Sequence, residues 1–199
     1  MLGGNVGLQT REKAPSGPDD KEFALHVLFV CTGNICRSPI GERLTVAYAA
    51  QHGIPNLTAS SAGTRAVIGH PIHRHAALTL ESRGADTSGF TARQLTAKIA
   101  SDADLVIAMT SAHRDIVLEA APRQLHKTFT LTEAARLAPM KGAQTLADLA
   151  ALRPQLAAHE QADIPDPIGQ SPEVFAAVGS QIAVLLSPIL ELCRRTFRD

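Results

Sequence analysis

A cysteine and an arginine stand six positions apart after an apolar segment, and together they could attack a bound oxyanion. Residues 25–38 read Leu-His-Val-Leu-Phe-Val-Cys-Thr-Gly-Asn-Ile-Cys-Arg-Ser. Backbone amides of a loop that opens a helix bind phosphate-like oxyanions, and their positive field favours a thiolate at Cys31. Arg37 adds a planar fork that can hold two oxygens at once. The sequence therefore predicts an anion-binding loop with Cys31 as nucleophile.

The residues around this pair fit a strand, a tight loop and a helix start. The apolar run before Cys31 is typical of a buried strand. Gly33 and Asn34 are the residue types that best tolerate left-handed backbone. Ser38 and the proline after it predict the first turn of a helix, with the serine as a candidate cap. The alternative is a buried structural cysteine at a strand end.

A second candidate for proton transfer lies in the segment Asp163-Ile-Pro-Asp-Pro167. Cleavage of a phosphate monoester needs a proton on the leaving oxygen, and a loop aspartate could deliver it and then accept one from water. Asp163 and Asp166 are both candidates from residue type alone. The alternative is that both are solvated turn aspartates beside prolines.

The segment from Cys31 to Pro39 resembles the signature of low-molecular-weight protein tyrosine phosphatases, of the bacterial type. That superfamily also contains thioredoxin-linked arsenate reductases and a phosphoarginine phosphatase. Residues 60–64, 103–110 and 163–167 resemble further segments of the family, in the family's order. The resemblance extends over residues 25–198 and implies a cysteine-dependent protein phosphatase that needs no cofactor.

The resemblance also implies roles for particular residues. Asp166 corresponds to the general acid and base because it directly precedes a proline. Asn34 would fix the strained loop, Ser38 would donate a hydrogen bond to the sulfur, and Ser61 would brace the asparagine. The catalytic set is then Cys31, Arg37 and Asp166, supported by Ser61 and Pro167, and the substrate-binding residues are Thr32, Gly33, Asn34, Ile35, Cys36, Ser38 and Ile168.

Cys36 allows two interpretations. A thiol five residues after Cys31 could trap an oxidised Cys31 as a reversible disulfide, as many family members do. The alternative is a small buried hydrophobic side chain. Two cysteines at this spacing lack a second pair of ligands, so we expect no metal site.

Composition limits the classes of partner and compartment. Lysine plus arginine (19) equals aspartate plus glutamate (19), which provides no long-range field for nucleic acid. No uninterrupted apolar run reaches the length of a spanning helix, so we expect no membrane span. Three cysteines without a disulfide pattern favour a reducing compartment, and we expect a cytoplasmic protein.

Strand-like and helix-like segments alternate from residue 25 onward, which predicts an α/β fold. We expect a single three-layer domain, with a four-stranded parallel sheet and helices on both faces. The expected strands are 25–31, 57–61, 104–109 and 127–130, and the expected helices are 38–52, 72–84, 92–100, 111–120, 131–137 and 171–197. Residues 1–22 read as a flexible tail before a phosphatase domain at 23–199, with a helical insertion near 139–163.

The expected substrate is phosphotyrosine in a protein, with an autophosphorylating tyrosine kinase as a possible partner. In the family, a branched aliphatic residue at the position of Ile35 resembles tyrosine phosphatases, whereas threonine there marks the phosphoarginine enzyme. A protein-arginine phosphatase therefore stays an alternative. An arsenate reductase is a weaker alternative because the chain has no cysteine between Cys36 and Cys193 to relay a disulfide. A non-catalytic phosphopeptide-binding module is the third.

Overall fold

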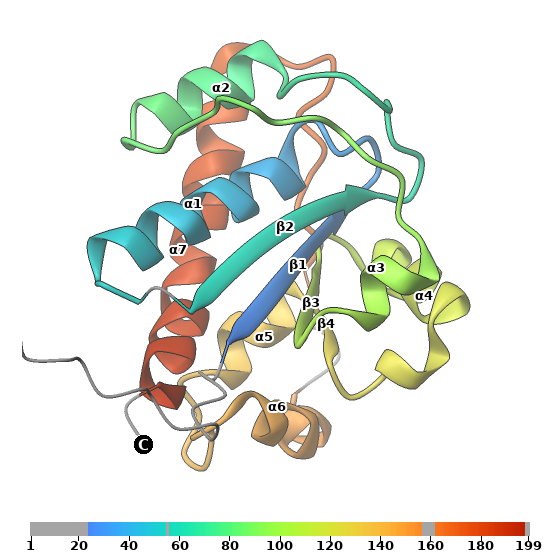
Figure 1. The fold of residues 1–199 in the computed structure, drawn as a ribbon, viewed down its shortest axis with the longest axis vertical. Coiled ribbons are helices and arrows are strands. Elements are labelled where there is room, and N and C mark those ends of the chain that lie inside the picture. The colour runs from blue at the N-terminus through green and yellow to red at the C-terminus, as the bar shows by residue number, and fades with distance from the viewer. Residues whose placement is uncertain (1–23, 55, 157–161, 198–199) are drawn as a thin grey trace, which may run out of the picture.

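The structure, a computed structural model, describes residues 24–54, 56–156 and 162–197. Four strands form one parallel sheet in the order β2-β1-β3-β4 (Figure 1). Their bounds are Leu25–Cys31 for β1, Leu57–Gly63 for β2, Leu105–Ala108 for β3 and Thr128–Thr130 for β4. The predicted tail, residues 1–22, lies outside the described residues.

The central strand β1 divides its side chains between two cores. Leu25, Val27 and Phe29 belong to one apolar cluster, and Leu28 and Val30 belong to the other. Side chains alternate along a strand, so a run that is apolar at nearly every position must be covered on both faces. The continuous apolar run read from the sequence is explained by this position between two layers.

Helices on both faces of the sheet complete three layers, as the sequence predicts (Figure 1). On one face lie α1 (Arg37–Gln51), α5 (Leu131–Leu137) and the long α7 (Pro172–Thr196), with α2 (Arg74–Glu81) packed on α7. On the other face lie α3 (Ala97–Ser101) and α4 (Ser111–Ala120). The loop after β1 and the segment at residues 163–167, both predicted from the sequence to carry catalytic residues, lie at the carboxyl edge of this sheet. Parallel sheets bind ligands at that edge.

The predicted helix at 92–100 begins too early. In the structure, Gln94 forms a bridge with Gly63, and the amide of Leu95 donates to the Gly63 carbonyl over 2.8 Å. These backbone groups are used in extending the sheet and cannot also form a helix. The helix α3 starts only after Thr96, whose side chain accepts the amide of Ile99.

In the described part of residues 139–163 lies the short helix α6 (Leu146–Leu152), followed by a 3-10 turn at Arg153–Gln155. The guanidinium of Arg153 lies 4.0 Å from the ring centroid of Phe129 and donates to the carbonyls of Leu125 and Thr128. Arg153 thereby ties this segment to β4. Residues 157–161 lie outside the described part, and the division into tail, domain and insertion stays a prediction.

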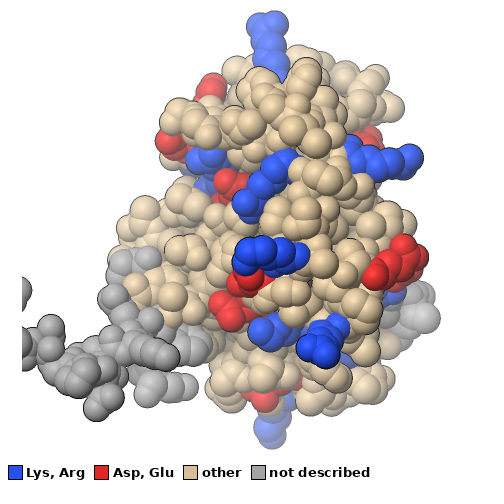
Figure 2. Space-filling model, turned by 45° about the vertical axis from the view of Figure 1, so that its right-hand side comes forward, with Lys and Arg blue, Asp and Glu red and all other residues tan. Residues whose placement is uncertain are grey.

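Helix α7 is, within the described ranges, the one helix long and apolar enough to cross a membrane by length and composition. The sequence predicts this helix at 171–197, and charged and polar residues interrupt its apolar run. In the fold, Phe175, Ile182 and Ile189 on α7 are buried in the core of the domain. Figure 2 shows acidic and basic side chains interspersed on one face of the molecule, in keeping with equal numbers of both.

Candidate active site

The loop after β1 turns its peptide carbonyls outward. The amides of Arg65, Val67 and His73 donate to the carbonyls of Thr32, Gly33 and Ile35, over 2.9, 3.0 and 2.7 Å.

Because the carbonyl and amide of one trans peptide unit point in opposite directions, the following amides of the loop face the other side. Asn34 adopts a positive φ of 56°, which a non-glycine residue sustains only when its surroundings hold it. The loop is therefore a cradle of amides fixed by outward hydrogen bonds.

Asn34 is held by hydrogen bonds from its side chain. Its Nδ2 donates to Ser61 Oγ over 2.8 Å and to Ser38 Oγ over 3.0 Å, and its Oδ1 accepts the amide of Arg93 over 2.9 Å. Asn34 is fully buried. The left-handed residue is thus braced from three directions, which fixes the shape of the loop.

Ser38 lies beside the sulfur of Cys31. The Oγ of Ser38 is 2.9 Å from Cys31 Sγ. The sequence reading of Ser38 as a possible helix cap is wrong, because α1 begins at Arg37 with Cys36 at the cap position. The hydroxyl is instead shared between the sulfur and Asn34, and it can donate to a thiolate.

Arg37 connects the loop to the segment that carries the aspartates. It is 4% exposed; its NH1 donates to the Ile164 carbonyl over 3.0 Å and its NH2 contacts Asp166 Oδ2 over 2.6 Å. Its Nε is buried and has no hydrogen-bond partner among the described residues. A buried guanidinium with an unused donor is suited to an additional oxyanion.

The two candidate aspartates occupy different places. Asp166 is half exposed and contacts Arg37, whereas Asp163 accepts the amide of Ser111 over 2.7 Å at the start of α4. Asp163 is not among the residues that line the pocket beside Cys31. The geometry therefore brings Asp166, and not Asp163, to the sulfur side of the loop.

A pocket of about 250 Å³ opens between the loop and the Asp166 segment. Its walls combine the nucleophile candidate, the arginine and apolar side chains. The predicted residues Asn34, Ser38 and Ser61 lie behind the loop, and the buried Pro167 is likewise outside the lining. The lining residues are Cys31, Thr32, Gly33, Ile35, Cys36, Arg37, Arg65, Val67, Asp166 and Ile168.

Cys36 is buried and chemically unlike a nucleophile. Burial, followed by the proximity of Cys31 and Asp166, raises the pKa of Cys36 to about 12. Cys31, Cys36 and Cys193 are all free thiols. A reversible disulfide between Cys31 and Cys36 stays a prediction.

Besides Arg65 and Val67, which line the pocket, two further residues of the site are absent from the set predicted from the sequence. Glu42 accepts a hydrogen bond of 2.6 Å from Ser61 Oγ, and burial raises the pKa of Glu42. His113 Nε2 lies 2.8 Å from Thr32 Oγ1. Glu42 could have been suspected because it lies four residues after Ser38 and thus on the same face of α1. His113 has no comparable local signal.

Comparisons with known proteins agree with this geometry. The family model described as "Low molecular weight phosphotyrosine protein phosphatase" matches residues 26–148. The phosphatase Etp of Escherichia coli is 36% identical over 76% of this chain and 83% of its own length. A protein-arginine-phosphatase of Geobacillus stearothermophilus is 30% identical over 83% of this chain and 93% of its own.

Solved structures show the same fold. The YwlE arginine phosphatase of Geobacillus stearothermophilus has a TM-score of 0.67 and 29% identity, covering 85% of this chain and 93% of its own. The tyrosine phosphatase Wzb of Escherichia coli, solved with sulphate, has a TM-score of 0.64 and 27% identity, covering 85% and 98%. With the family model extending over more than half of the sequence, the chain belongs to the low-molecular-weight phosphotyrosine protein phosphatases and is a phosphatase enzyme.

Proposed function

We propose that the protein hydrolyses phosphotyrosine in protein substrates, with Cys31 as nucleophile, Arg37 as anion clamp and Asp166 as general acid and base. One observation carries the assignment: these three side chains line a single pocket with the amide cradle at its base. The contact between Ser38 Oγ and Cys31 Sγ supports it, because a donated hydrogen bond stabilises a thiolate and makes sulfur a better leaving group.

The reaction would proceed in two balanced steps. Cys31 Sγ attacks phosphorus in line, the bond from phosphorus to the phenolic oxygen breaks, and Asp166 gives its proton to that oxygen. Asp166 then takes a proton from water, the water oxygen attacks phosphorus, and the phosphorus–sulfur bond breaks to release phosphate and thiolate. Arg37 and the loop amides stabilise the charge on the equatorial oxygens throughout.

The walls of the pocket favour an aromatic leaving group. Ile35, Val67 and Ile168 present apolar side chains around the entrance. A flat phenyl ring buries apolar surface there, which supports an aromatic leaving group over the polar guanidinium of phosphoarginine. Among these side chains, Ile35 is the one whose type resembles tyrosine phosphatases, and it supports a preference for phosphotyrosine.

A protein-arginine phosphatase is the second candidate. It is supported by the relative of that name at 30% identity and by the similar YwlE structure. The two candidates share Cys31, Arg37 and Asp166 and differ in the leaving group that the pocket accepts. Comparison of phosphotyrosine and phosphoarginine peptides of one sequence separates them.

The deciding experiment compares the wild type with Cys31→Ser, Asp166→Ala and the control Cys193→Ala. Wild type and control should both turn over para-nitrophenyl phosphate. Both should also dephosphorylate the phosphotyrosine peptide faster than the phosphoarginine peptide of the same sequence. Cys31→Ser should be inactive, and Asp166→Ala should be slower by about a hundredfold or more while inorganic phosphate still inhibits it.

Activity in Cys31→Ser would overturn the nucleophile, and an unchanged Asp166→Ala would overturn the acid. Faster hydrolysis of phosphoarginine would select the second candidate. A wild type that binds a phosphopeptide without turnover would indicate a binding module.

The proposed partner is a phosphorylated protein that serves as substrate. Specifically, we propose an autophosphorylating tyrosine kinase, with both proteins in the cytoplasm. Equal numbers of acidic and basic residues argue against nucleic acid as a partner. Dephosphorylation of a co-expressed tyrosine kinase, followed with an antibody to phosphotyrosine, tests this extension.

A further inference from the structure

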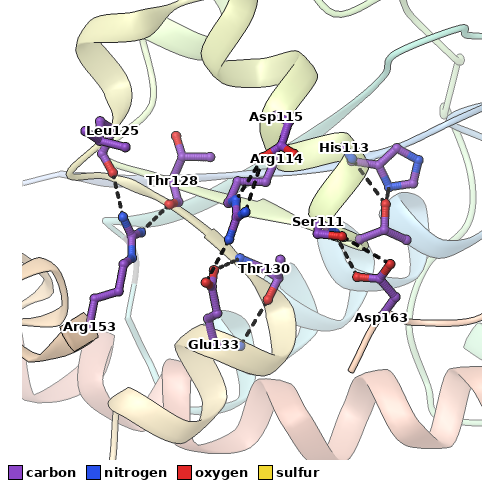
Figure 3. Close-up of polar contacts among 11 residues, drawn as sticks. Ser111, His113, Arg114, Asp115, Leu125, Thr128, Thr130, Glu133, Arg153 and Asp163 are labelled. Atoms are coloured by element: carbon purple, nitrogen blue, oxygen red, sulfur yellow. Dashed lines mark hydrogen bonds and ion pairs between the residues drawn. The ribbon is translucent and has the colours of Figure 1, made fainter. Parts of the chain in front are cut away.

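The first turn of α4 hydrogen-bonds to two parts of the site. One is the loop at residues 32–36, called the phosphate loop below, and the other is the segment at residues 163–167 that carries Asp166, called the acid segment. Thr110 caps this helix. Ser111 and His113 follow it and are labelled in Figure 3. Two separate sets of hydrogen bonds leave this turn, one toward Thr32 and one toward Asp163.

The first set ends at the phosphate loop. His113 Nε2 lies 2.8 Å from Thr32 Oγ1, and its Nδ1 lies 2.8 Å from Thr110 Oγ1, which also accepts the His113 amide over 3.1 Å. His113 is 6% exposed. A neutral imidazole offers one donor and one acceptor, so it can satisfy both hydroxyls at once. Thr32 is the residue directly after Cys31.

The second set ends at the acid segment. Asp163 Oδ1 accepts the Ser111 amide over 2.7 Å, and the amide of Ile164 donates to the Met109 carbonyl over 2.9 Å. Figure 3 shows the Asp163 side chain directed at Ser111. Asp166 follows Asp163 by only three positions, so this anchor limits where Asp166 can lie relative to the sulfur.

We propose that His113 and Asp163 are positioning residues that fix the phosphate loop and the acid segment relative to each other. His113 anchors the loop to the first turn of α4, and Asp163 anchors the acid segment to the same turn. The proposal rests on the proposed function, because it takes Cys31 as nucleophile and Asp166 as acid. Neither residue is among those that line the pocket. His113 acts on the cradle through Thr32, and Asp163 acts on proton delivery through the short segment to Asp166.

The two anchors predict different kinetic defects, which a merely structural role would not produce. Asp163→Ala should misplace the acid. It should slow phenyl phosphate, whose leaving group needs a proton, by about tenfold or more and change 2,4-dinitrophenyl phosphate little. Inhibition by inorganic phosphate should be unchanged. Asp163→Asn keeps an oxygen acceptor for the Ser111 amide and should restore the wild-type ratio of the two rates.

His113→Phe should loosen the cradle. We expect it to slow both esters by a similar factor of about tenfold and to weaken inhibition by inorganic phosphate. Thr32→Val removes the same hydrogen bond from its other end, so adding His113→Phe to Thr32→Val should cause little further loss. The control is Asp115→Asn, an exposed carboxylate on the same helix, which should behave as wild type.

The proposal is overturned if Asp163→Ala slows both esters equally or neither, if Asp163→Asn fails to restore the ratio, or if His113→Phe and Thr32→Val are additive. Asp166→Ala is measured in parallel. If that variant shows no greater loss on phenyl phosphate than on the dinitrophenyl ester, the proposed acid has failed, and not the anchor. Should His113→Phe fail to fold, Thr32→Val alone must still weaken phosphate inhibition.

Discussion

Acidification should destabilise the protein through His113. Burial, and next the charge of Arg37, lower the pKa of His113 from its ordinary 6.5 to about 4, with a small contribution in the same direction from Arg65. The negative charges of Asp163 and Asp166 oppose this shift. The folded protein therefore resists a proton that the unfolded chain accepts near pH 6.5.

The sign and size of the effect follow from that difference. The stabilisation is fully present above pH 6.5 and is lost progressively as the pH falls toward 4. The full difference corresponds to about 3 kcal/mol, and partial access of solvent to the ring reduces it. Between pH 7 and pH 5 we expect His113 to account for a loss of about 1 to 2 kcal/mol in the free energy of unfolding.

Urea unfolding at pH 7 and pH 5 measures this loss in the wild type and in His113→Phe. Other groups that titrate contribute to both proteins, so the difference between the two losses isolates His113. His70→Phe, at an exposed histidine, controls for the removal of an imidazole. Equal losses in the wild type and in His113→Phe would refute the reasoning that the ring is held neutral by burial.

Three further predictions concern the phosphate loop. Arg37→Lys should lower kcat/KM for para-nitrophenyl phosphate by about a hundredfold or more, because an ammonium cannot replace the fork that reaches both Ile164 and Asp166; activity near that of wild type would contradict the clamp. Ile35→Thr should shift the ratio of rates on matched peptides from phosphotyrosine toward phosphoarginine, and an unchanged ratio would remove the argument from the apolar wall. Gly63→Ala would place a Cβ 2.5 Å from the Thr32 carbonyl oxygen, so it should lower the free energy of unfolding by about 1 to 3 kcal/mol and weaken inhibition by inorganic phosphate. Calorimetry measures the stability and inhibition kinetics measure the phosphate binding. An unaffected variant would show that the loop can move to accommodate the methyl group.

Much of the fold could be predicted from local patterns. The apolar run at β1 and the alternation of strands with helices sufficed for a parallel sheet in three layers. The error at residues 92–100 arose because Gln94 and Leu95 pair with the distant Gly63. A partner about 30 residues away along the chain leaves no periodic trace in the local sequence.

The sequence by itself determined the residues that stand next to one another along the chain. The order from Cys31 to Ser38 places sulfur, loop and arginine within one strand–loop–helix turn, whose geometry is local. The candidates Asp163 and Asp166, in contrast, could not be ranked from residue type, since both are aspartates within two positions of a proline in one short segment.

Only the tertiary structure decided how distant segments meet. Asp166 reaches Arg37 across 129 positions of sequence, and His113 reaches Thr32 across 81. These contacts depend on the carboxyl ends of β1 and β3 lying side by side, because parallel pairing brings all strand ends to one edge. Spacing along the sequence determines which residues form the strand–loop–helix turn. The packing of helices on the sheet determines which residues that are distant in sequence line the same pocket.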